Sequence, residues 1–338
     1  MRLLVIGGSV FLGHAIVTSA LRRGDRVTVF NRGRSGTDVP GTEVIRGDRE
    51  NPGDLRRLVE GRRWDAVVDT CGYVPRVVGA SARLLSAHAD AYLFVSSVHA
   101  YAGWPERPVD EGSARHACPP DSGPDAEVPY NALKAGCERA VEAGFGGRVL
   151  IVNPGLITGP REQVPRLTWW LNRVAAGGPF LAPGDPGRAM QLIDARDIAA
   201  FGLGLLAAGA TGRYLASGVR GNTTFGALLA DCVRVTGSDA EPVWVDDAFL
   251  LGQEVTEWTE LPMWAPDGPD MAGVWLPSSD KALRAGLRCR PVGETVRDIW
   301  AHIMSTGGEP VGGQGIDPAK ERRILAAWAA ARGNGGAR

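Results

Sequence analysis

A glycine-rich turn near the N-terminus constrains the fold more than any other feature of this sequence. The apolar run 3–6 ends at Gly7-Gly8-Ser9-Val10-Phe11-Leu12-Gly13, and apolar residues then recur at helical spacing over Phe11–Arg23. Gly7 can make the tight turn, Gly13 allows the helix to pack closely on the strand, and the free N–H groups at the helix start attract a pyrophosphate. A strand, glycine turn and helix in this order predict a dinucleotide-binding domain.

Strand and helix signals alternate through the first 150 residues. Strands this apolar, alternating with helices, form a parallel sheet that is covered on both faces. The sequence therefore predicts an α/β fold with a Rossmann-type, doubly wound parallel sheet. The expected strands are 3–6, 26–30, 43–45, 65–68, 92–95 and 148–152, and the expected helices are 11–23, 54–59, 77–87 and 130–143.

The composition of the chain changes after Pro154, because eight of the ten tryptophans lie beyond it. A Gly-rich stretch at 305–314 is typical of a linker, and Asp317-Pro318 predicts the start of a terminal helix. The expected parts are a dinucleotide-binding domain over 1–160 with contributions from about 185–220, a smaller substrate-binding region over 161–315, and a C-terminal helix over 316–338.

The alternating pattern also breaks between Ala102 and Pro129, where six prolines and six acidic residues predict a long loop. Loops of this length are usually functional. We expect this one to become ordered when substrate binds.

Charge and cysteine content exclude several classes of function. The net charge of -1 gives no basic field for nucleic acid or an anionic membrane. Five cysteines without a C-x-x-C spacing argue against disulfides and a metal site and indicate a reducing cytosol. The apolar runs are too short for a signal peptide or a membrane span. We expect a cytoplasmic monomer or homodimer that binds a small molecule.

The end of the second strand bears on cofactor choice. An acidic residue there would bond the ribose 2′-hydroxyl of NAD, but the sequence has Asn31-Arg32-Gly33-Arg34. Guanidinium groups suit a 2′-phosphate, which favours NADP(H) over NAD(H), unless both arginines are solvated loop charges. Asp48 can accept a hydrogen bond from the adenine amino group or cap a turn.

Tyr130 and Lys134 stand four residues apart on an expected helix and therefore share one face. An ammonium group beside a phenol lowers the pKa of the phenol, which makes Tyr130 a candidate general acid or base. Ser97, at the end of the fifth expected strand, supplies a hydroxyl that can bond a substrate oxygen.

With these features the chain resembles the extended, NAD-dependent epimerase/dehydratase-like branch of the short-chain dehydrogenase/reductases. The resemblance covers about 1–220 well and extends to ketoreductases of actinobacterial secondary metabolism. It is carried by Gly7–Gly13, Gly47-Asp48, Val95–Tyr101, Tyr130–Lys134, Asn153–Pro160 and Gln191–Ala199.

The resemblance implies that Ser97, Tyr130 and Lys134 form a catalytic triad. It also implies that Lys134 holds the nicotinamide ribose and that the segment after the sixth strand passes beside the nicotinamide. The implied cofactor-binding residues are Gly7, Gly8, Ser9, Val10, Phe11, Leu12, Gly13, Asn31, Arg32, Arg34, Asp48, Cys71, Lys134, Asn153, Pro154 and Leu156.

Three positions depart from the family pattern. Val10 replaces a glycine, which loosens or displaces the dinucleotide, and Asn153 replaces a common arginine. Val98-His99 replaces the Asp-Glu pair of nucleotide-sugar dehydratases, which argues against elimination of water. His99 is expected to face the loop or the core.

Three functions remain open. The first is an NADPH-dependent ketoreductase for a bulky, polycyclic aromatic (polyketide-type) ketone. The second is a nucleotide-sugar epimerase with bound NAD, whose diphosphate Arg188, Arg213 and Arg220 would bind. The third is a non-catalytic, RNA-associated relative. About half of an aromatic-rich set is expected in the core and the rest in a substrate pocket. The set is Trp169, Trp170, Trp258, Pro262, Met263, Trp264 and Trp275.

Overall fold

Seven parallel strands form the centre of the fold in the order β11-β6-β5-β4-β1-β2-β3. The structure is a computed structural model that describes residues 1–125, 127–307 and 313–335. Each predicted strand is present, and β11 joins them beside β6. Their bounds are β1 Arg2–Ile6, β2 Arg26–Asn31, β3 Glu43–Arg46, β4 Ala66–Asp69, β5 Ala91–Val95, β6 Arg148–Pro154 and β11 Gly212–Ala216.

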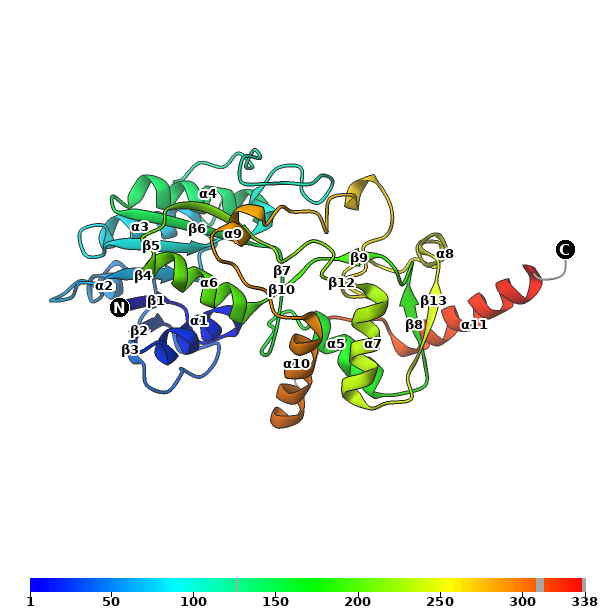
Figure 1. The fold of residues 1–338 in the computed structure, drawn as a ribbon. Coiled ribbons are helices and arrows are strands. Elements are labelled where there is room, and N and C mark those ends of the chain that lie inside the picture. The colour runs from blue at the N-terminus through cyan, green and yellow to red at the C-terminus, as the bar shows by residue number, and fades with distance from the viewer. Residues whose placement is uncertain (126, 308–312, 336–338) are drawn as a thin grey trace.

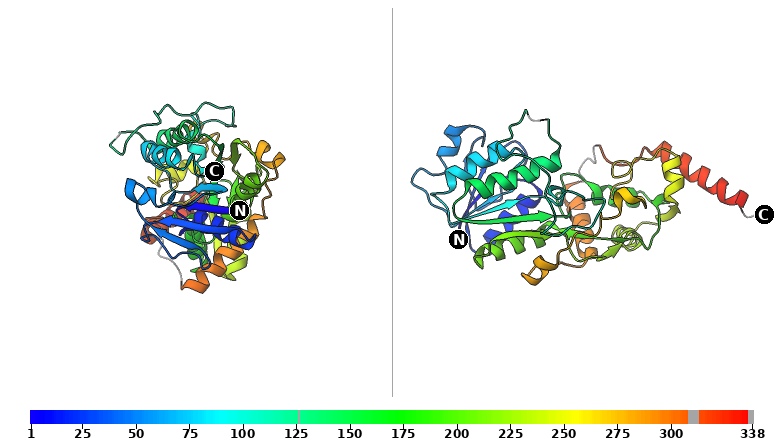
Figure 2. Two further views of the ribbon diagram at one scale, coloured as in Figure 1. Left: turned by 90° about the vertical axis from the view of Figure 1, so that its left-hand side faces the viewer. Right: turned by 90° about the horizontal axis from the view of Figure 1, so that it is seen from above.

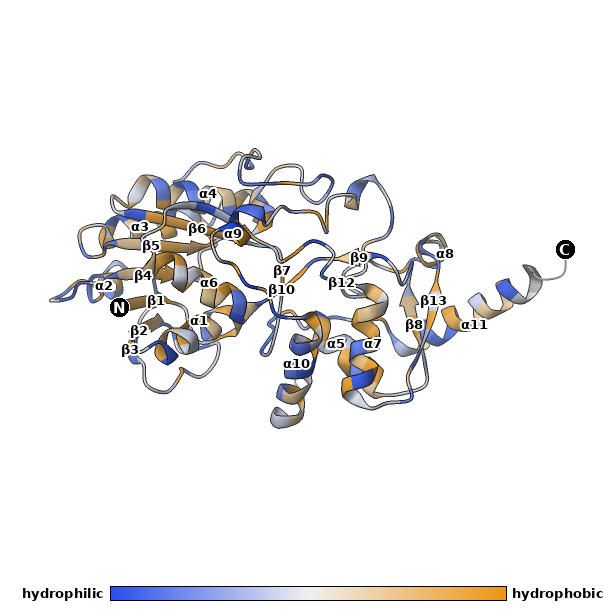
Figure 3. Cartoon of the chain, viewed as in Figure 1, coloured by the Kyte–Doolittle hydropathy of each residue, from blue (hydrophilic) through white to orange (hydrophobic). Residues whose placement is uncertain are grey.

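Helices cover both faces of this sheet (Figure 1). Side chains alternate along a strand, so Leu3 and Val5 of β1 pack in one apolar cluster and Leu4 and Ile6 in another. The first cluster lies under α1 and α6, and the second lies under α3 and α4. Figure 3 shows the resulting apolar strands between the helices, and the predicted Rossmann-type α/β fold is confirmed. The helix bounds are α1 Phe11–Arg22, α2 Pro52–Arg56, α3 Pro75–Leu85, α4 Tyr130–Gly144 and α6 Ala195–Ala207.

Most of the remaining elements build a second apolar core around Trp170 and Trp264, whereas Ala282 of α9 (Asp280–Arg284) packs in the cluster under α1 and α6. Three two-stranded sheets, β10-β7, β12-β9 and β13-β8, connect its helices. The strands are β7 Leu156–Thr158, β8 Pro179–Pro183, β9 Ala189–Met190, β10 Leu192–Asp194, β12 Thr223–Thr224 and β13 Glu241–Val245. The helices are α5 Arg166–Ala175, α7 Phe225–Thr236, α8 Asp247–Gly252, α9 Asp280–Arg284, α10 Val292–Thr306 and α11 Pro318–Gly335, with short 3-10 turns at Val98–Ala100 and Pro269–Met271.

The terminal helix α11 begins where its capping signal predicts. The Asp317 carboxylate accepts hydrogen bonds from the N–H groups of Ala319 and Lys320, at 2.9 and 3.0 Å. The helix then extends away from the rest of the molecule (Figure 2). Positions 308–312 of the predicted linker and 336–338 of the predicted helix lie outside the described residues. Within the described part, no helix has the length and apolar character needed to cross a membrane.

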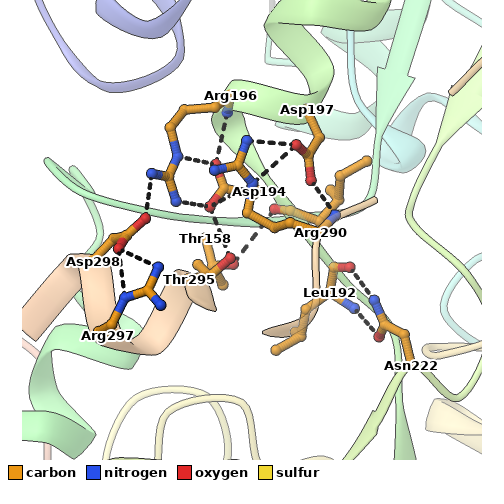
Figure 4. Close-up of polar contacts among 11 residues, drawn as sticks. Thr158, Leu192, Asp194, Arg196, Asp197, Asn222, Arg290, Thr295, Arg297 and Asp298 are labelled. Carbon is orange, nitrogen blue, oxygen red and sulfur yellow. Dashed lines mark hydrogen bonds and ion pairs between the residues drawn. The ribbon is translucent and has the colours of Figure 1, made fainter. Parts of the chain in front are cut away.

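A buried carboxylate ties the central sheet region to α10 (Figure 4). Asp194 caps α6, pairs with Arg196 at 2.6 Å and accepts a hydrogen bond from the Thr295 hydroxyl of α10 at 2.8 Å. Arg196 in turn pairs with Asp298 of α10 at 2.6 Å. Burial acts to raise the pKa of Asp194, but the hydrogen bonds from Arg196 and Thr295 outweigh it and hold the pKa below its ordinary value.

Candidate active site

Two cavities open beside the glycine turn at the carboxyl ends of the parallel strands. The strand order reverses between β1 and β4, and ligands of such sheets bind at this point. Ser9 and Val10 line the smaller cavity, of about 230 Å³, and Phe11 lines the larger one, of about 640 Å³. A ligand that follows the turn therefore has one part in each cavity.

The glycine turn has the geometry that its sequence predicts. Gly7 has a φ of +106°, which favours glycine. A Cβ at Gly13 would lie 2.9 Å from the backbone nitrogen of Gly8, so only glycine lets the helix approach this closely. The residues present therefore fit a pyrophosphate at the start of α1.

The Val10 side chain does not obstruct the glycine turn. It caps α1 in an extended conformation and lines the smaller cavity. A Cβ at Gly36 would lie 3.2 Å from Val10 Cγ1, which places the Val10 side chain against the loop after β2. Val10 thus packs on the loop that carries the predicted 2′-phosphate residues.

The residues predicted to select the cofactor at the end of the second strand all line the smaller cavity. They are Asn31, Arg32 and Arg34. Asn31 donates to Asp38 at 2.9 Å and accepts from the Gly33 N–H at 2.8 Å, so its side chain shapes the loop. Arg32 is half exposed, 3.9 Å from Asp48, and Arg34 is exposed. Asp48 also accepts from the Glu50 N–H at 3.0 Å, which matches its turn-capping alternative.

An ion pair beneath this cavity was missed by sequence reasoning. Arg49 makes two hydrogen bonds of 3.0 and 2.8 Å to the fully buried Asp69, which also accepts from the Tyr92 hydroxyl. Arg49 borders Cys71, a predicted cofactor contact that lines the cavity. Burial raises the pKa of the Cys71 thiol, so the thiol itself is uncharged at neutral pH. The available signal was an aspartate at the end of an apolar strand, which needs a partner.

The three predicted catalytic residues occupy adjoining positions. Ser97 caps the short turn after β5, and Tyr130 is the first residue of α4. Both line the larger cavity, and their side chains are hydrogen-bonded. Lys134 lies one turn further along α4, as its spacing predicts, but it is buried.

The prediction that Lys134 lowers the pKa of the Tyr130 phenol is wrong for this structure. Its ammonium group donates to the carbonyl oxygens of Gly72 and Val95, at 3.0 and 2.9 Å. Burial raises the pKa of Tyr130, and the hydrogen bond with Ser97 only partly opposes this effect. Tyr130 therefore holds its proton at neutral pH.

A polar cluster behind the cavity, also missed, fixes α4. Glu138 is fully buried, pairs with Arg115 at 3.0 Å, and accepts hydrogen bonds from Ser96 and Asn153. Asn153 also donates to the carbonyl oxygen of Ser97 at 3.1 Å and lines neither of the two cavities. Asn153 is therefore placed to hold the backbone of Ser97, and not to contact the cofactor as the resemblance implies. The signal was the spacing of Glu138, one further turn along the face of Tyr130 and Lys134.

The other implied cofactor residues are divided between the cavities and the core. Gly7 lines the smaller cavity, and Phe11, Pro154 and Leu156 line the larger one. Leu12 is buried inside the fold.

Aromatic residues form much of the larger cavity. Trp258 and Trp275 line it with their rings 5.8 Å apart, and Trp104 of the long loop joins them. The other tryptophans of the aromatic set, Trp169, Trp170 and Trp264, are buried in the core. Met263 is buried there too. More than the expected half of the set therefore lies in the core, and Trp258 and Trp275 line the cavity.

His99 packs against Trp104 of the long loop, as expected, and it also lines the larger cavity. The turn that Ser97 caps directs the ring between Trp104, at 4.4 Å, and Tyr130, at 5.6 Å between centroids. Burial lowers the pKa of His99 to about 4, and the positive charge of Arg166 makes a smaller contribution in the same direction. The imidazole is therefore neutral at physiological pH.

The long loop is anchored to its surroundings. Arg115 pairs with Glu138 and Glu142 of α4, each at 3.0 Å. The carbonyl oxygens of Pro105 and Val109 accept N–H bonds from Gly273 and Ser278. Its ordering by substrate stays a prediction.

The comparisons with known proteins agree with this geometry. Residues 3–215 match the model of the NAD dependent epimerase/dehydratase family. The chain is 32% identical over 185 residues to 2-alkyl-3-oxoalkanoate reductase of Stenotrophomonas maltophilia, over 49% of this chain and 54% of that protein. It is 29% identical over 215 residues to 2'-dehydrokanamycin reductase of Streptomyces kanamyceticus, over 61% and 58%. The chain thus spans little more than half the length of these curated relatives.

The fold also matches solved structures. The enzyme WbmH of Bordetella bronchiseptica, in complex with NAD+, superposes with a TM-score of 0.70 over 90% of this chain and 99% of that chain. The identity is 16%, so this likeness concerns the fold alone.

Proposed function

The chain belongs to the NAD dependent epimerase/dehydratase family, and from that premise we propose that it is an NADPH-dependent ketoreductase for a bulky, largely apolar ketone such as a polycyclic aromatic one. One observation carries the proposal: Ser97 and Tyr130 open on a cavity of about 640 Å³ whose walls include three tryptophans. Both curated relatives are named as reductases, which supports the same reaction class.

The side chains suit protonation of a carbonyl oxygen. A bound nicotinamide supplies the hydride. The Ser97 hydroxyl orients the substrate oxygen by a hydrogen bond, and the Tyr130 phenol donates the proton. The phenol, whose pKa is raised by burial, is protonated at neutral pH and can donate its proton as negative charge develops on the substrate oxygen. The apolar walls exclude water from the developing charge.

The arginines expected to serve an epimerase are engaged outside this cavity. Arg188 pairs with Asp247 at 2.6 Å, Arg213 donates to the Glu111 carbonyl oxygen, and Arg220 donates to that of Leu276. A sugar nucleotide would therefore lack these three partners for its diphosphate.

The reaction is tested with purified protein, NADPH and a polycyclic ketone, by the loss of NADPH absorbance. We expect reduction of the polycyclic ketone by added NADPH, which exchanges freely with the protein. Retained NAD together with interconversion of UDP-sugars, and no ketone reduction, would instead identify an epimerase.

The first quantitative prediction concerns the cofactor. The exposed Arg32 and Arg34 guanidinium groups border the smaller cavity, so a 2′-phosphate gains on the order of 1–3 kcal/mol through charge-assisted bonds. We expect NADP(H) to bind about 5- to 150-fold more tightly than NAD(H) in titrations, and Arg32→Ala to lose much of this difference. Arg26→Ala, at the opposite end of β2, is the matched control. Equal affinities in the wild type contradict the prediction.

A further inference from the structure

Arg166 places a positive charge in the wall of the larger cavity. It is the first residue of α5 and lies beside Gln163 and Val164 in the lining. Among the described residues of this lining it is the only Lys or Arg, and the lining holds no Asp or Glu. The remaining walls are mainly aromatic, aliphatic or neutral polar.

No hydrogen bond or ion pair of the Arg166 guanidinium is present among the described residues. Glu162 is close enough to interact with it, but its carboxyl group is directed to the start of α5. There it accepts hydrogen bonds from the N–H groups of Leu167 and Thr168, at 3.1 and 3.3 Å. Burial raises the pKa of Glu162 to about 8, which leaves this carboxyl mostly protonated at neutral pH. The charge of Arg166 therefore lacks a compensating anion from the protein.

A partly buried guanidinium without an acceptor is costly, because it loses hydration and gains no partner. A ligand that brings an anion removes this cost. The guanidinium presents a planar fork that matches both oxygens of one carboxylate. Since the lining has no second Lys or Arg, a single anionic group fits this wall better than a diphosphate.

We propose that Arg166 binds a carboxylate of the substrate, so that the enzyme reduces bulky keto acids in preference to neutral ketones. This inference rests on the proposed function and names the substrate class. His99 lies between the two ends of the site: its ring is 5.6 Å from that of Tyr130, and it is close enough to Arg166 for the positive charge of Arg166 to oppose its protonation. The ketone and the carboxylate therefore belong to one molecule that fills one cavity.

The test compares two ligands that differ only in charge: a bulky aryl keto acid and its methyl ester. Binding is followed by the fluorescence of the cavity tryptophans, which requires no turnover. We expect the wild type to bind the acid about 10- to 100-fold more tightly than the ester. Arg166→Gln should remove this preference and leave the affinity for the ester unchanged. Arg161→Gln, an exposed neighbour outside the lining, is the matched control and should retain the preference.

Two results would overturn the proposal. One is equal binding of acid and ester by the wild type, or an equal loss of both in Arg166→Gln. The other is tighter binding of UDP than of the keto acid, which would assign Arg166 to a nucleotide diphosphate. If the protein reduces neither ligand with NADPH, the proposed reaction fails, but the binding comparison still decides the role of Arg166.

Discussion

Tyr130→Phe lowers the single-turnover rate of ketone reduction by about 10²- to 10⁴-fold, the usual contribution of a general acid. The phenol lines the cavity beside Ser97 and retains its proton at neutral pH, so its removal leaves the substrate oxygen without a donor. The affinity for the cofactor should barely change, because the phenol oxygen faces the substrate. Rapid mixing of the enzyme–NADPH complex with ketone measures the rate.

Tyr214→Phe is the matched control, because Tyr214 lies on β11 and lines neither of the two cavities. This variant should keep the wild-type rate. Lys134→Ala should lower both turnover and cofactor affinity, since Lys134 also fixes the Gly72 and Val95 carbonyl groups. A loss below threefold in Tyr130→Phe would show that the proton comes from water or from the substrate.

The second large effect concerns stability. Asp194→Ala removes the cap of α6 and the acceptor of the buried Thr295 hydroxyl, while Arg196 keeps its pair with Asp298 (Figure 4). The lost cap costs about 1 kcal/mol, and the buried hydroxyl left without an acceptor costs about 1–3 kcal/mol more. We expect the apparent melting temperature, followed by circular dichroism, to fall by roughly 5–12 °C.

Asp231→Ala is the control for this measurement. Asp231 pairs with Arg234 on the surface of α7, and exposed pairs contribute at most about 1 kcal/mol. A similar melting temperature for the two variants would contradict the assigned role of Asp194.

The same pair predicts a pH dependence. The folded pKa of Asp194 lies below its ordinary value of about 4, so its stabilising contribution is fully present above that pH. The contribution is lost as the pH falls through the folded pKa. The difference in melting temperature between the wild type and Asp194→Ala should therefore be constant from pH 5 to 8 and should narrow below pH 4.

Local patterns were sufficient to predict the sheet and the glycine turn. Apolar runs and helical spacing fix these elements within a few residues, as β1 and α1 show. The i, i+4 rule also placed Tyr130 and Lys134 on one face of α4. These features depend on neighbours in the sequence.

Contacts between distant residues account for what the sequence did not predict. The carbonyl oxygens that bind Lys134 come from positions 62 and 39 residues away. The partner of Glu138 lies 23 residues away in an irregular loop, and that of Arg49 lies 20 residues away. The free guanidinium of Arg166 becomes visible only when the other residues of the cavity wall are known.

The contact of Arg115 with Glu138 limits how this protein can be re-engineered. Trp104 and Pro105 of the long loop form part of the cavity wall, so loop grafting from a relative is an obvious way to alter selectivity. Arg115 is, however, a structural brace for the helix that begins with Tyr130. A transplanted loop without an arginine at this position would leave Glu138 uncompensated inside the protein. A change of this loop therefore alters the support of α4 as well as the cavity wall. A chimera must keep the arginine of the loop together with the glutamate of the helix.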